Sequence, residues 1–327
     1  YPSVFNPDCY VQELVNQGKS LEDAREGGCS GCIEVGAFGK EAYVLTGYLN
    51  TPKILEITLN NGWDPNSGKK LGLETGDPRT FTSYEQLYEA YHKQMLHFVN
   101  LKLSVNNYIE RMFALYAPAT FLSLFIDDCI TKGKDYYNGG ARYNTTYIQC
   151  TGLGTTTDCF ATIKKHVFED KRYTMDELLT AVAANFEGHE KMRQYIMNRT
   201  PFFGNDDEYA DTIAVKVYED LVKAIKGHPN TRGGETQLNM LSTTCHNYFG
   251  SVCHATPNGR LAHFAISDGT SPAHGADTNG PTSVIKSLGK LDQTQSGGTL
   301  LNMRFIPALL KREEDLDKLV SLIRAYF

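Results

Sequence analysis

The sequence predicts a protein of the α/β class, on the basis of two patterns. Segments with apolar residues at helical spacing recur along the chain, and several begin with residues that cap helix N-termini. Short apolar or threonine-rich runs lie between them. Helices that alternate with such runs are typical of folds whose strands line a core and whose loops carry the chemistry. The runs are residues 120–126, 145–153, 238–244, 262–267 and 299–306.

The predicted helices are recognised by their first residues. Asn6 followed by Pro7 favours a helix within the first twenty residues. Capping boxes at Thr82-Ser83-Tyr84-Glu85 and Thr174-Met175-Asp176-Glu177 open two further helices. The predicted helices begin near residues 6, 20, 82, 174, 207 and 313. Residues 41–60 are periodic and apolar, and the Asn61-Gly62 pair after them marks a turn. No internal repeat or linker is visible, so one domain is expected.

Composition excludes several classes of protein. The chain has 327 residues, 41% hydrophobic and 21% charged, which is typical of a globular protein with a large core. A formal net charge of -6 without a basic cluster argues against nucleic acid as the partner. No apolar run approaches the roughly 20 residues that cross a bilayer, so no membrane partner is expected.

The cysteines and the two ends of the chain give further expectations. Eight cysteines in a chain of this length favour reduced thiols in the cytoplasm over a disulfide framework. The chain begins at Tyr1, and Phe327 falls within an amphipathic helical pattern, which favours a truncated gene product.

The residues with most chemical potential lie in a glycine-rich stretch from Gly27 to Gly39. Cys32 and Glu34 are two residues apart, so both side chains can face one cavity. A nearby carboxylate hinders ionisation of a thiol, because like charge raises its pKa. The pair therefore suits a neutral sulfur radical beside a carboxylate base better than a thiolate nucleophile. From these residues alone, a buried structural cysteine in a glycine turn stays open. Cys29 and Cys32 also form a lone Cys-x-x-Cys, for which zinc binding, disulfide exchange and simple packing of Cys29 remain open.

Other polar residues gather in glycine-bearing loops, for which an ordinary turn is the alternative reading. Arg142 and Arg260 either clamp a carboxylate or tie loops together. His246 directly follows Cys245, and neighbours on a strand point to opposite faces, which favours a packed or supporting histidine. No phosphate-binding or dinucleotide-binding glycine motif is present, so no nucleotide is expected.

Taken together, several ordered motifs resemble the glycyl radical enzymes, the superfamily that includes pyruvate formate-lyase. The resemblance runs through almost the whole chain. Its most specific segments are Gly31-Cys32-Ile33-Glu34, Lys53-Ile54-Leu55-Glu56 with Asn60-Asn61-Gly62, Gly139-Gly140-Ala141-Arg142-Tyr143-Asn144, Pro257-Asn258-Gly259-Arg260 and Ser267-Asp268-Gly269-Thr270-Ser271-Pro272.

The resemblance implies a ten-stranded barrel of two five-stranded half-barrels, surrounded by helices, of which residues 1–327 are a part. It implies that Cys32 lies on a loop at the barrel centre and becomes a thiyl radical. The radical would come from a glycyl radical that is installed by a radical S-adenosylmethionine activating enzyme with its iron-sulfur cluster. The glycine belongs to an Arg-Val-x-Gly-Tyr-like segment that this sequence lacks. The glycine radical domain and the N-terminal half-barrel are therefore expected to lie outside the chain, with no metal bound within it. A homodimer in the cytoplasm of an anaerobic bacterium is expected for the full-length protein.

Within the superfamily, Cys-x-Glu is similar to the dehydratases, the choline lyases and the arylacetate decarboxylases. Ile33 replaces the second cysteine that acyl transfer needs, which argues against formate acetyltransferase-like chemistry. The continuation Gly36-Ala37-Phe38-Gly39-Lys40-Glu41 and the segment Thr243-Thr244-Cys245-His246 resemble most the hydroxyproline dehydratase branch. That resemblance implies that Cys32 abstracts hydrogen, Glu34 manages the hydroxyl proton and Thr243 borders a small-molecule substrate. Val35 and Ala37 stand where that branch is expected to have Thr and Cys, so the substrate stays open.

Two alternatives remain from the sequence. A relative that cleaves a C–C or C–N bond would share the same cysteine and carboxylate. An inactive structural barrel fragment would share the fold without the chemistry. Gene context separates the inactive fragment from an active enzyme, since a radical glycine segment and a neighbouring activating-enzyme gene accompany an active enzyme.

Overall fold

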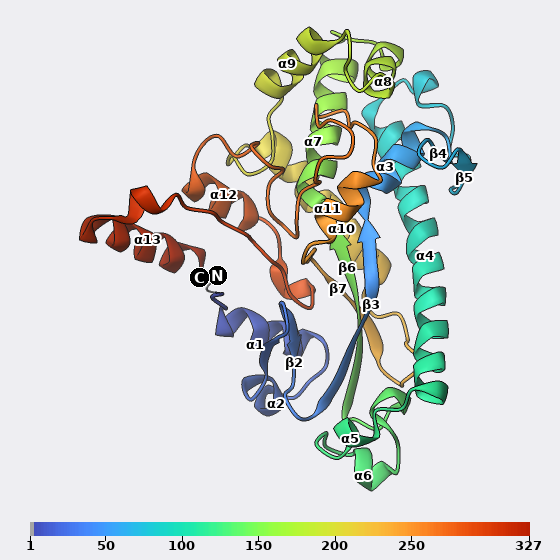
Figure 1. The fold of residues 1–327 in the computed structure, drawn as a ribbon, viewed down its shortest axis with the longest axis vertical. Coiled ribbons are helices and arrows are strands. Elements are labelled where there is room, and N and C mark those ends of the chain that lie inside the picture. Colours follow the sequence, from blue (N-terminus) through green and yellow to red (C-terminus); the bar gives the residue numbers. More distant parts are fainter. Residues whose placement is uncertain (1–2) are drawn as a thin grey trace.

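The computed structural model describes residues 3–327, which fold around a small parallel sheet covered by helices on one side (Figure 1). The sheet holds three strands, β3 (Glu41–Asn50), β6 (Tyr143–Thr151) and β7 (Glu235–Asn239), in the order β3-β6-β7. Both pairings are parallel. The segment after Ser296 continues the sheet beyond β7, because the Gly297 N–H donates to the Leu238 carbonyl and the Met240 N–H to that of Gly298. A mixed α/β architecture, as the sequence predicted, is confirmed.

The two faces of the sheet differ in character because side chains alternate along each strand. Ile148 and Cys150 of β6 and Leu238 of β7 point to the helix side and join the main core. That core is formed with the long helix α4 (Tyr84–Tyr116), α7 (Leu153–Ile163) and α10 (Glu208–Ile225). The opposite face carries polar side chains, among them Gln149, and is buried as well. A sheet buried on both faces with one polar face is suited to holding a reactive centre.

A small subdomain covers the polar face of the sheet. It contains α1 (Pro7–Asn16), α2 (Leu21–Arg25) and a hairpin of β1 (Gly28–Ser30) and β2 (Glu34–Gly36). Figure 1 shows α4 on one side of the sheet and this subdomain on the other. Leu14, Ala24 and Val35 form its own apolar cluster, with Cys29 packed against them.

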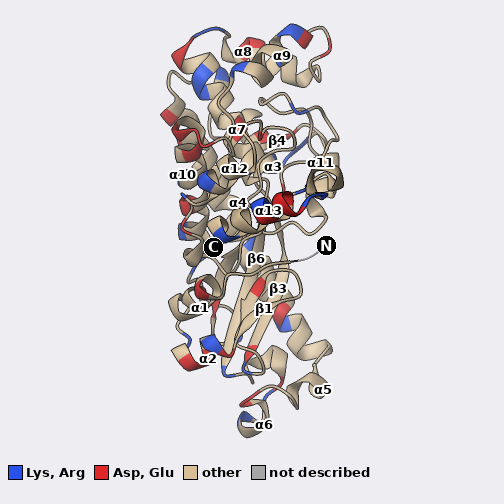
Figure 2. Cartoon of the chain, turned by 90° about the vertical axis from the view of Figure 1, so that its left-hand side faces the viewer, with Lys and Arg blue, Asp and Glu red and all other residues tan. Residues whose placement is uncertain are grey.

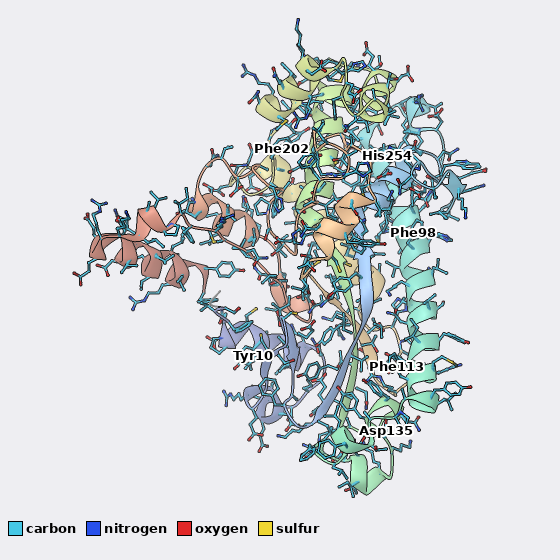
Figure 3. The ribbon with its side chains drawn as sticks, in the orientation of Figure 1. Tyr10, Phe98, Phe113, Asp135, Phe202 and His254 are labelled. Atoms are coloured by element: carbon cyan, nitrogen blue, oxygen red, sulfur yellow. The ribbon has the colours of Figure 1, made fainter. Side chains whose placement is uncertain are left out.

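The remaining elements surround this centre. Phe98 and Phe113 lie along α4 (Figure 3), and the Phe113 ring lies 5.3 Å from that of Tyr137, which ties the lower end of α4 to the 120–140 segment. The other helices and strands are α3 (Thr51–Leu59), β4 (Trp63–Asp64), β5 (Lys69–Lys70), α5 (Thr120–Ser123), α6 (Cys129–Lys132), α8 (Met175–Ala183), α9 (Glu190–Arg199), α11 (Cys245–Ser251), α12 (Pro281–Leu288) and α13 (Glu313–Tyr326).

Most predicted helix starts are confirmed by their caps. The Asn6 side chain accepts from the Asp8 and Cys9 N–H groups, and Ser20 caps α2. The capping box of Thr174 and Glu177 is complete. The box at Thr82–Glu85 was misplaced by one residue, because Ser83 is the N-cap of α4 and accepts from the Gln86 N–H. The Thr82 N–H instead donates to the Gln86 side chain.

Several predicted strand runs are wrong. Residues 120–126 begin with the short helix α5, and 262–267 form a loop. The run 299–306 has only an isolated bridge, from Thr299 to Met240. The periodic stretch 41–60 divides into β3 and α3, with Asn50 as the cap of α3. A short apolar run does not by itself distinguish a strand from a helix or a loop. Burial does not explain the run 120–126, because Phe121, Leu124 and Phe125 are exposed.

Charged side chains are interspersed over the surface. In Figure 2, basic and acidic residues alternate along the helices, without one large patch of a single sign. None of the helices described for residues 3–327 is long and apolar enough to span a bilayer.

Candidate active site

Cys32 lies at the tip of the β1–β2 hairpin. Ser30 pairs with Glu34 in the antiparallel register, so Gly31, Cys32 and Ile33 form the connection. Gly31 has φ +55°, a left-handed conformation that glycine adopts without steric cost. The resulting tight turn leaves Cys32 exposed while Ile33 is buried. The glycine-rich stretch thus presents one thiol at the end of a short, pinned hairpin.

Glu34 is buried directly beside this tip and is held on both carboxylate oxygens. Its Oε2 accepts from the backbone N–H groups of Cys32 and Ile33, each at 3.2 Å. Its Oε1 accepts from Gln149 Nε2 at 2.6 Å. All three donors are neutral. A carboxylate has about four acceptor positions, so about one remains free, on Oε1.

The ionisable side chains around Glu34 are thiols and phenols. Burial raises the pKa of Cys29 to about 12, with Glu13 and Glu34 adding to the rise. Burial also raises the pKa of Tyr43, Tyr48 and Tyr147. These thiol and phenol groups are therefore neutral at ordinary pH.

Thr243 and Tyr48 complete the polar surroundings of the thiol. Cys32 Sγ lies 3.7 Å from Thr243 Oγ1, and the Tyr48 hydroxyl lies 3.3 Å from the same oxygen. Tyr48 comes from β3, whereas Thr243 follows the end of β7. Thr243 has φ +51°, which is an outlier for a β-branched residue. Such strained conformations cluster at binding and catalytic sites.

The hairpin is tied to the sheet by its backbone. The Val35 N–H donates to the Gly297 carbonyl at 3.2 Å, and the Tyr147 hydroxyl donates to the Val35 carbonyl at 2.7 Å. A Cβ on Gly297 would lie 2.0 Å from the Tyr147 ring, so a side chain there would displace the ring. A Cβ on Gly298 would likewise overlap the hairpin, because it would lie 2.3 Å from the Ile33 carbonyl oxygen.

A buried ion pair supports the strand that leaves the hairpin. Glu41, the first residue of β3, accepts from the Ala37 N–H at 2.8 Å and pairs with Lys19 Nζ at 2.9 Å. Thr145 also donates to Glu41. The Lys19 and Glu41 side chains are 1% and 0% exposed. The charges stabilise each other inside the protein, so they contribute to the placement of the hairpin.

A cavity of about 620 Å³ lies on the other side of the hairpin, toward α1. Glu13 lines it and is buried, and Cys9 Sγ lies 3.5 Å from its Oε1 as a donor. Burial raises the pKa of Glu13 to about 8, although the hydrogen bond from Cys9 opposes the shift. Tyr10, labelled in Figure 3, lines the same cavity from α1. Cys32 is not among its lining residues.

The structure also places the other sequence candidates. Arg142 pairs with Asp23 at 3.4 Å and with Asp127 at 3.1 Å, so it ties loops together. Arg260 donates to the carbonyls of His254, Leu261 and Phe264, which is again a structural role.

The adjacent pair Cys245 and His246 begins α11 and not a strand, which corrects the assumption of opposite faces. The His246 ring nitrogen Nδ1 lies 3.0 Å from Ser242 Oγ. Burial lowers the pKa of His246, so this histidine is a neutral supporting group.

Two members of the site were not singled out from the sequence. Gln149 lay inside a threonine-rich run, and Tyr48 inside a periodic apolar one. Gln149 lies between the apolar residues Ile148 and Cys150, which point to the opposite face of the strand. This alternation of apolar and polar residues could have identified Gln149 as a side chain on the polar face. The pairing of β3 with β6 could not be read from the sequence.

The cysteines and the acidic residues form neither disulfides nor a metal cluster in the part of the chain that the structure describes. Cys29 packs against the cluster of Leu14, Ala24 and Val35.

Comparison with known proteins places this geometry in a family. The family model "Pyruvate formate lyase-like" matches residues 1–250. The chain belongs to the pyruvate formate lyase-like family. A second model, "Glycine radical", matches residues 266–327 of this pyruvate formate lyase-like chain. The glycine radical domain was expected to lie outside the chain, and this match includes part of the chain in that domain. No Arg-Val-x-Gly-Tyr-like segment occurs in the sequence.

Among relatives of this pyruvate formate lyase-like chain, trans-4-hydroxy-L-proline dehydratase from Clostridioides difficile is 53% identical over 326 residues. The alignment covers 100% of this chain and 41% of that protein. A (2S)-3-sulfopropanediol dehydratase from Klebsiella oxytoca is 34% identical, with 100% and 40% covered.

The crystal structure of the Clostridioides difficile hydroxyproline dehydratase, with trans-4-hydroxy-L-proline bound, superposes with a TM-score of 0.98 at 53% identity. It covers 100% of this chain and 41% of that chain. The chain therefore spans about two fifths of the length of these pyruvate formate lyase-like relatives.

Proposed function

We propose that the enzyme carrying this chain is a glycyl radical lyase that removes water from a small hydroxylated substrate. The observation that carries the proposal is the pairing of an exposed thiol, Cys32, with a carboxylate, Glu34, that neutral donors hold in place. Trans-4-hydroxy-L-proline is the first substrate to test, because a relative of that activity is 53% identical over the whole chain.

The surroundings of Cys32 fit a hydrogen-atom donor. Its sulfur contacts the Thr243 hydroxyl. Among the described residues, no imidazole or cation of the kind that a thiolate nucleophile uses lies in hydrogen-bond contact with it. A glycyl radical, placed by the family resemblance on a glycine outside the chain, supplies the one-electron oxidation that removes the hydrogen atom from Cys32 Sγ. The site needs no bound metal for this step.

The chain's own residues then carry the reaction. Cys32, as a thiyl radical, takes a hydrogen atom from substrate carbon, so that an S–H bond forms as the C–H bond breaks. Glu34 accepts a substrate proton and passes it to the leaving hydroxyl, so the C–O bond breaks with loss of water and the carboxylate is restored. The hydrogen on Cys32 returns to the product radical and regenerates the thiyl radical. Atoms and electrons balance without a further oxidant or reductant.

Thr243 is proposed to border the substrate. Its hydroxyl lies between Cys32 Sγ and the Tyr48 hydroxyl, so a substrate atom at the thiol would meet it. The proposal extends to partners, namely a radical S-adenosylmethionine activating enzyme with its iron-sulfur cluster and a second copy of the enzyme in a homodimer. The reduced cysteines suit the cytoplasm of an organism that grows without oxygen.

The test uses the complete enzyme, activated anaerobically with its activating enzyme. Electron paramagnetic resonance measures the radical, and turnover is then measured with trans-4-hydroxy-L-proline, glycerol, choline and an arylacetate. A radical signal with dehydration of hydroxyproline supports the proposal. Absence of a radical, or full turnover by Cys32→Ala, refutes the mechanism. Turnover of only choline or the arylacetate keeps the radical chemistry and refutes the dehydratase assignment.

Glu34→Gln tests the base separately. The variant is isosteric, so the hairpin and the radical are expected to persist while most turnover is lost. Unchanged turnover in Glu34→Gln would show that Glu34 is not the base.

A further inference from the structure

Gln149 lies at the centre of the polar face of the sheet and touches the proposed base. Its side chain is 0% exposed, and Nε2 donates to Glu34 Oε1 at 2.6 Å. We propose that Gln149 is a positioning residue that fixes the orientation of the Glu34 carboxylate. The inference rests on the proposed function, because it concerns the base of that reaction.

The geometry gives Gln149 control over one oxygen. The two backbone donors of the hairpin, the N–H groups of Cys32 and Ile33, both bind Oε2. Gln149 binds Oε1, which is also the oxygen with about one acceptor position left for a substrate proton. The last torsion of a glutamate has only a broad preference, so a carboxylate held on one oxygen would swing. The hydrogen bond from Gln149 restricts this rotation and fixes the direction of Glu34 Oε1.

Gln149 is itself held rigidly by the sheet. It lies on the central strand β6, opposite Tyr48 of β3 and Asn239 of β7. Its carbonyl oxygen Oε1 is buried and has no partner among the described residues. Among the described residues, the Gln149 amide nitrogen donates to Glu34 alone.

Gln149 is the side-chain donor to Glu34 among the described residues. The titratable groups that face Glu34 are Cys32 and Cys29 from the hairpin, Tyr43 and Tyr48 from β3, and Tyr147 from β6. None of these is cationic, so the orientation of the carboxylate depends on its hydrogen bonds.

The main test variant is Gln149→Met in the complete, activated enzyme, which keeps the side-chain length and removes the donor. Loss of a hydrogen bond to a charged group corresponds to roughly a 10- to 100-fold fall in kcat with the radical signal retained. KM is expected to change less than kcat, because Gln149 acts on Glu34 and not on the substrate.

Gln237→Met is the matched control. Gln237 is a buried glutamine on the neighbouring strand β7 and makes no hydrogen bond to Glu34. Its variant is expected to keep the wild-type kcat. The inference is overturned if Gln149→Met keeps the wild-type kcat, or if Gln149→Met and Gln237→Met lose activity equally.

A second measurement separates this inference from the proposed function. The carboxylate band of Glu34, assigned by subtraction of Glu34→Gln, is recorded by infrared difference spectroscopy in the unactivated protein. A shifted band in Gln149→Met, with an unchanged band in Gln237→Met, supports the inference even if no tested substrate turns over, and an unchanged band in Gln149→Met refutes it. Absence of turnover in the wild type concerns the proposed function alone.

Discussion

The Tyr147 hydroxyl donates a 2.7 Å hydrogen bond to the Val35 carbonyl. Tyr147 is fully buried on the central strand, and Val35 lies in β2, directly after Glu34. This bond joins the hairpin of Cys32 to β6, the central strand of the sheet. It requires the Tyr147 ring to pass against Gly297, where a Cβ would lie 2.0 Å from it. The position of the thiol therefore depends on a glycine far from it in sequence.

Gly297→Ala is expected to displace the hairpin. The added methyl group overlaps the Tyr147 ring, and overpacking of this kind costs about 1 to 3 kcal/mol. Turnover is expected to fall by more than tenfold, measured with the complete enzyme, together with a lower melting temperature. Tyr147→Leu in the same chain removes the overlap and is expected to recover part of the stability. Gly289→Ala is the control, because its nearest contact is 3.4 Å. Equal effects of Gly297→Ala and Gly289→Ala would contradict the steric argument.

Substitutions of Thr243 separate its hydroxyl from its backbone strain. Thr243→Gly relaxes the φ of +51°, so the folded state is expected to become more stable or to change little. The same variant loses the hydroxyl beside Cys32, and KM is expected to rise more than kcat falls. Thr243→Ser retains the hydroxyl and is expected to stay within about threefold of the wild type, since one contact is conserved. Steady-state kinetics of the three proteins check this, and equal kinetics for Gly and Ser would exclude a role of the hydroxyl.

The buried pair of Lys19 and Glu41 gives a stability prediction. Burial lowers the pKa of Lys19, and Glu41 opposes that shift, so each charge depends on the other. Lys19→Met leaves Glu41 buried and unpaired, which costs about 3 to 5 kcal/mol. Lys19→Met with Glu41→Gln removes both charges and is expected to lose much less.

Urea unfolding of the complete protein at neutral pH measures both variants. Lys93→Met is the surface control, because Lys93 and its partner Glu89 are mostly exposed. Equal losses in the single and the double variant would mean that the charge on Glu41 does not matter.

Glu13 gives a pH dependence of known sign. Its pKa is about 8 in the folded protein, against 4.5 ordinarily, so the folded state retains a proton that the unfolded chain releases. Stability from this group is therefore full below about pH 4.5 and falls as pH rises toward 8, by up to about 4 kcal/mol between pH 5 and 8.

Glu13→Gln is expected to remove this slope and to stabilise the protein at pH 8 relative to the wild type. Melting temperatures across pH 5 to 8 check it, with Glu22→Gln, an exposed position on the neighbouring helix, as the control. A slope that persists in Glu13→Gln must come from other groups.

The helices were predictable because their starts are local. Asn6, Ser20, Thr174 and Asp207 cap the helices that follow them, and each cap is formed by atoms within three residues. The strands were less predictable, since residues 120–126 and 299–306 have the composition of strands without the partner that a strand needs.

The nearness of Cys32 to Glu34 was predictable for a similar reason. Glu34 Oε2 binds the N–H groups of Cys32 and Ile33, so the carboxylate and the thiol are placed together by a turn of a few residues. The family motif and the local geometry therefore point to the same residues.

The sequence by itself determined the helix starts, the α/β class and the nearness of Cys32 to Glu34, because all of these depend on short-range contacts and composition. Only the tertiary structure decided that Gln149, Tyr48 and Thr243 meet this pair. They come from three strands or strand ends separated by about a hundred residues each, and parallel pairing of β3, β6 and β7 alone brings them to one face. Strand pairing is a long-range choice of register, and a single sequence does not encode it in any local signal.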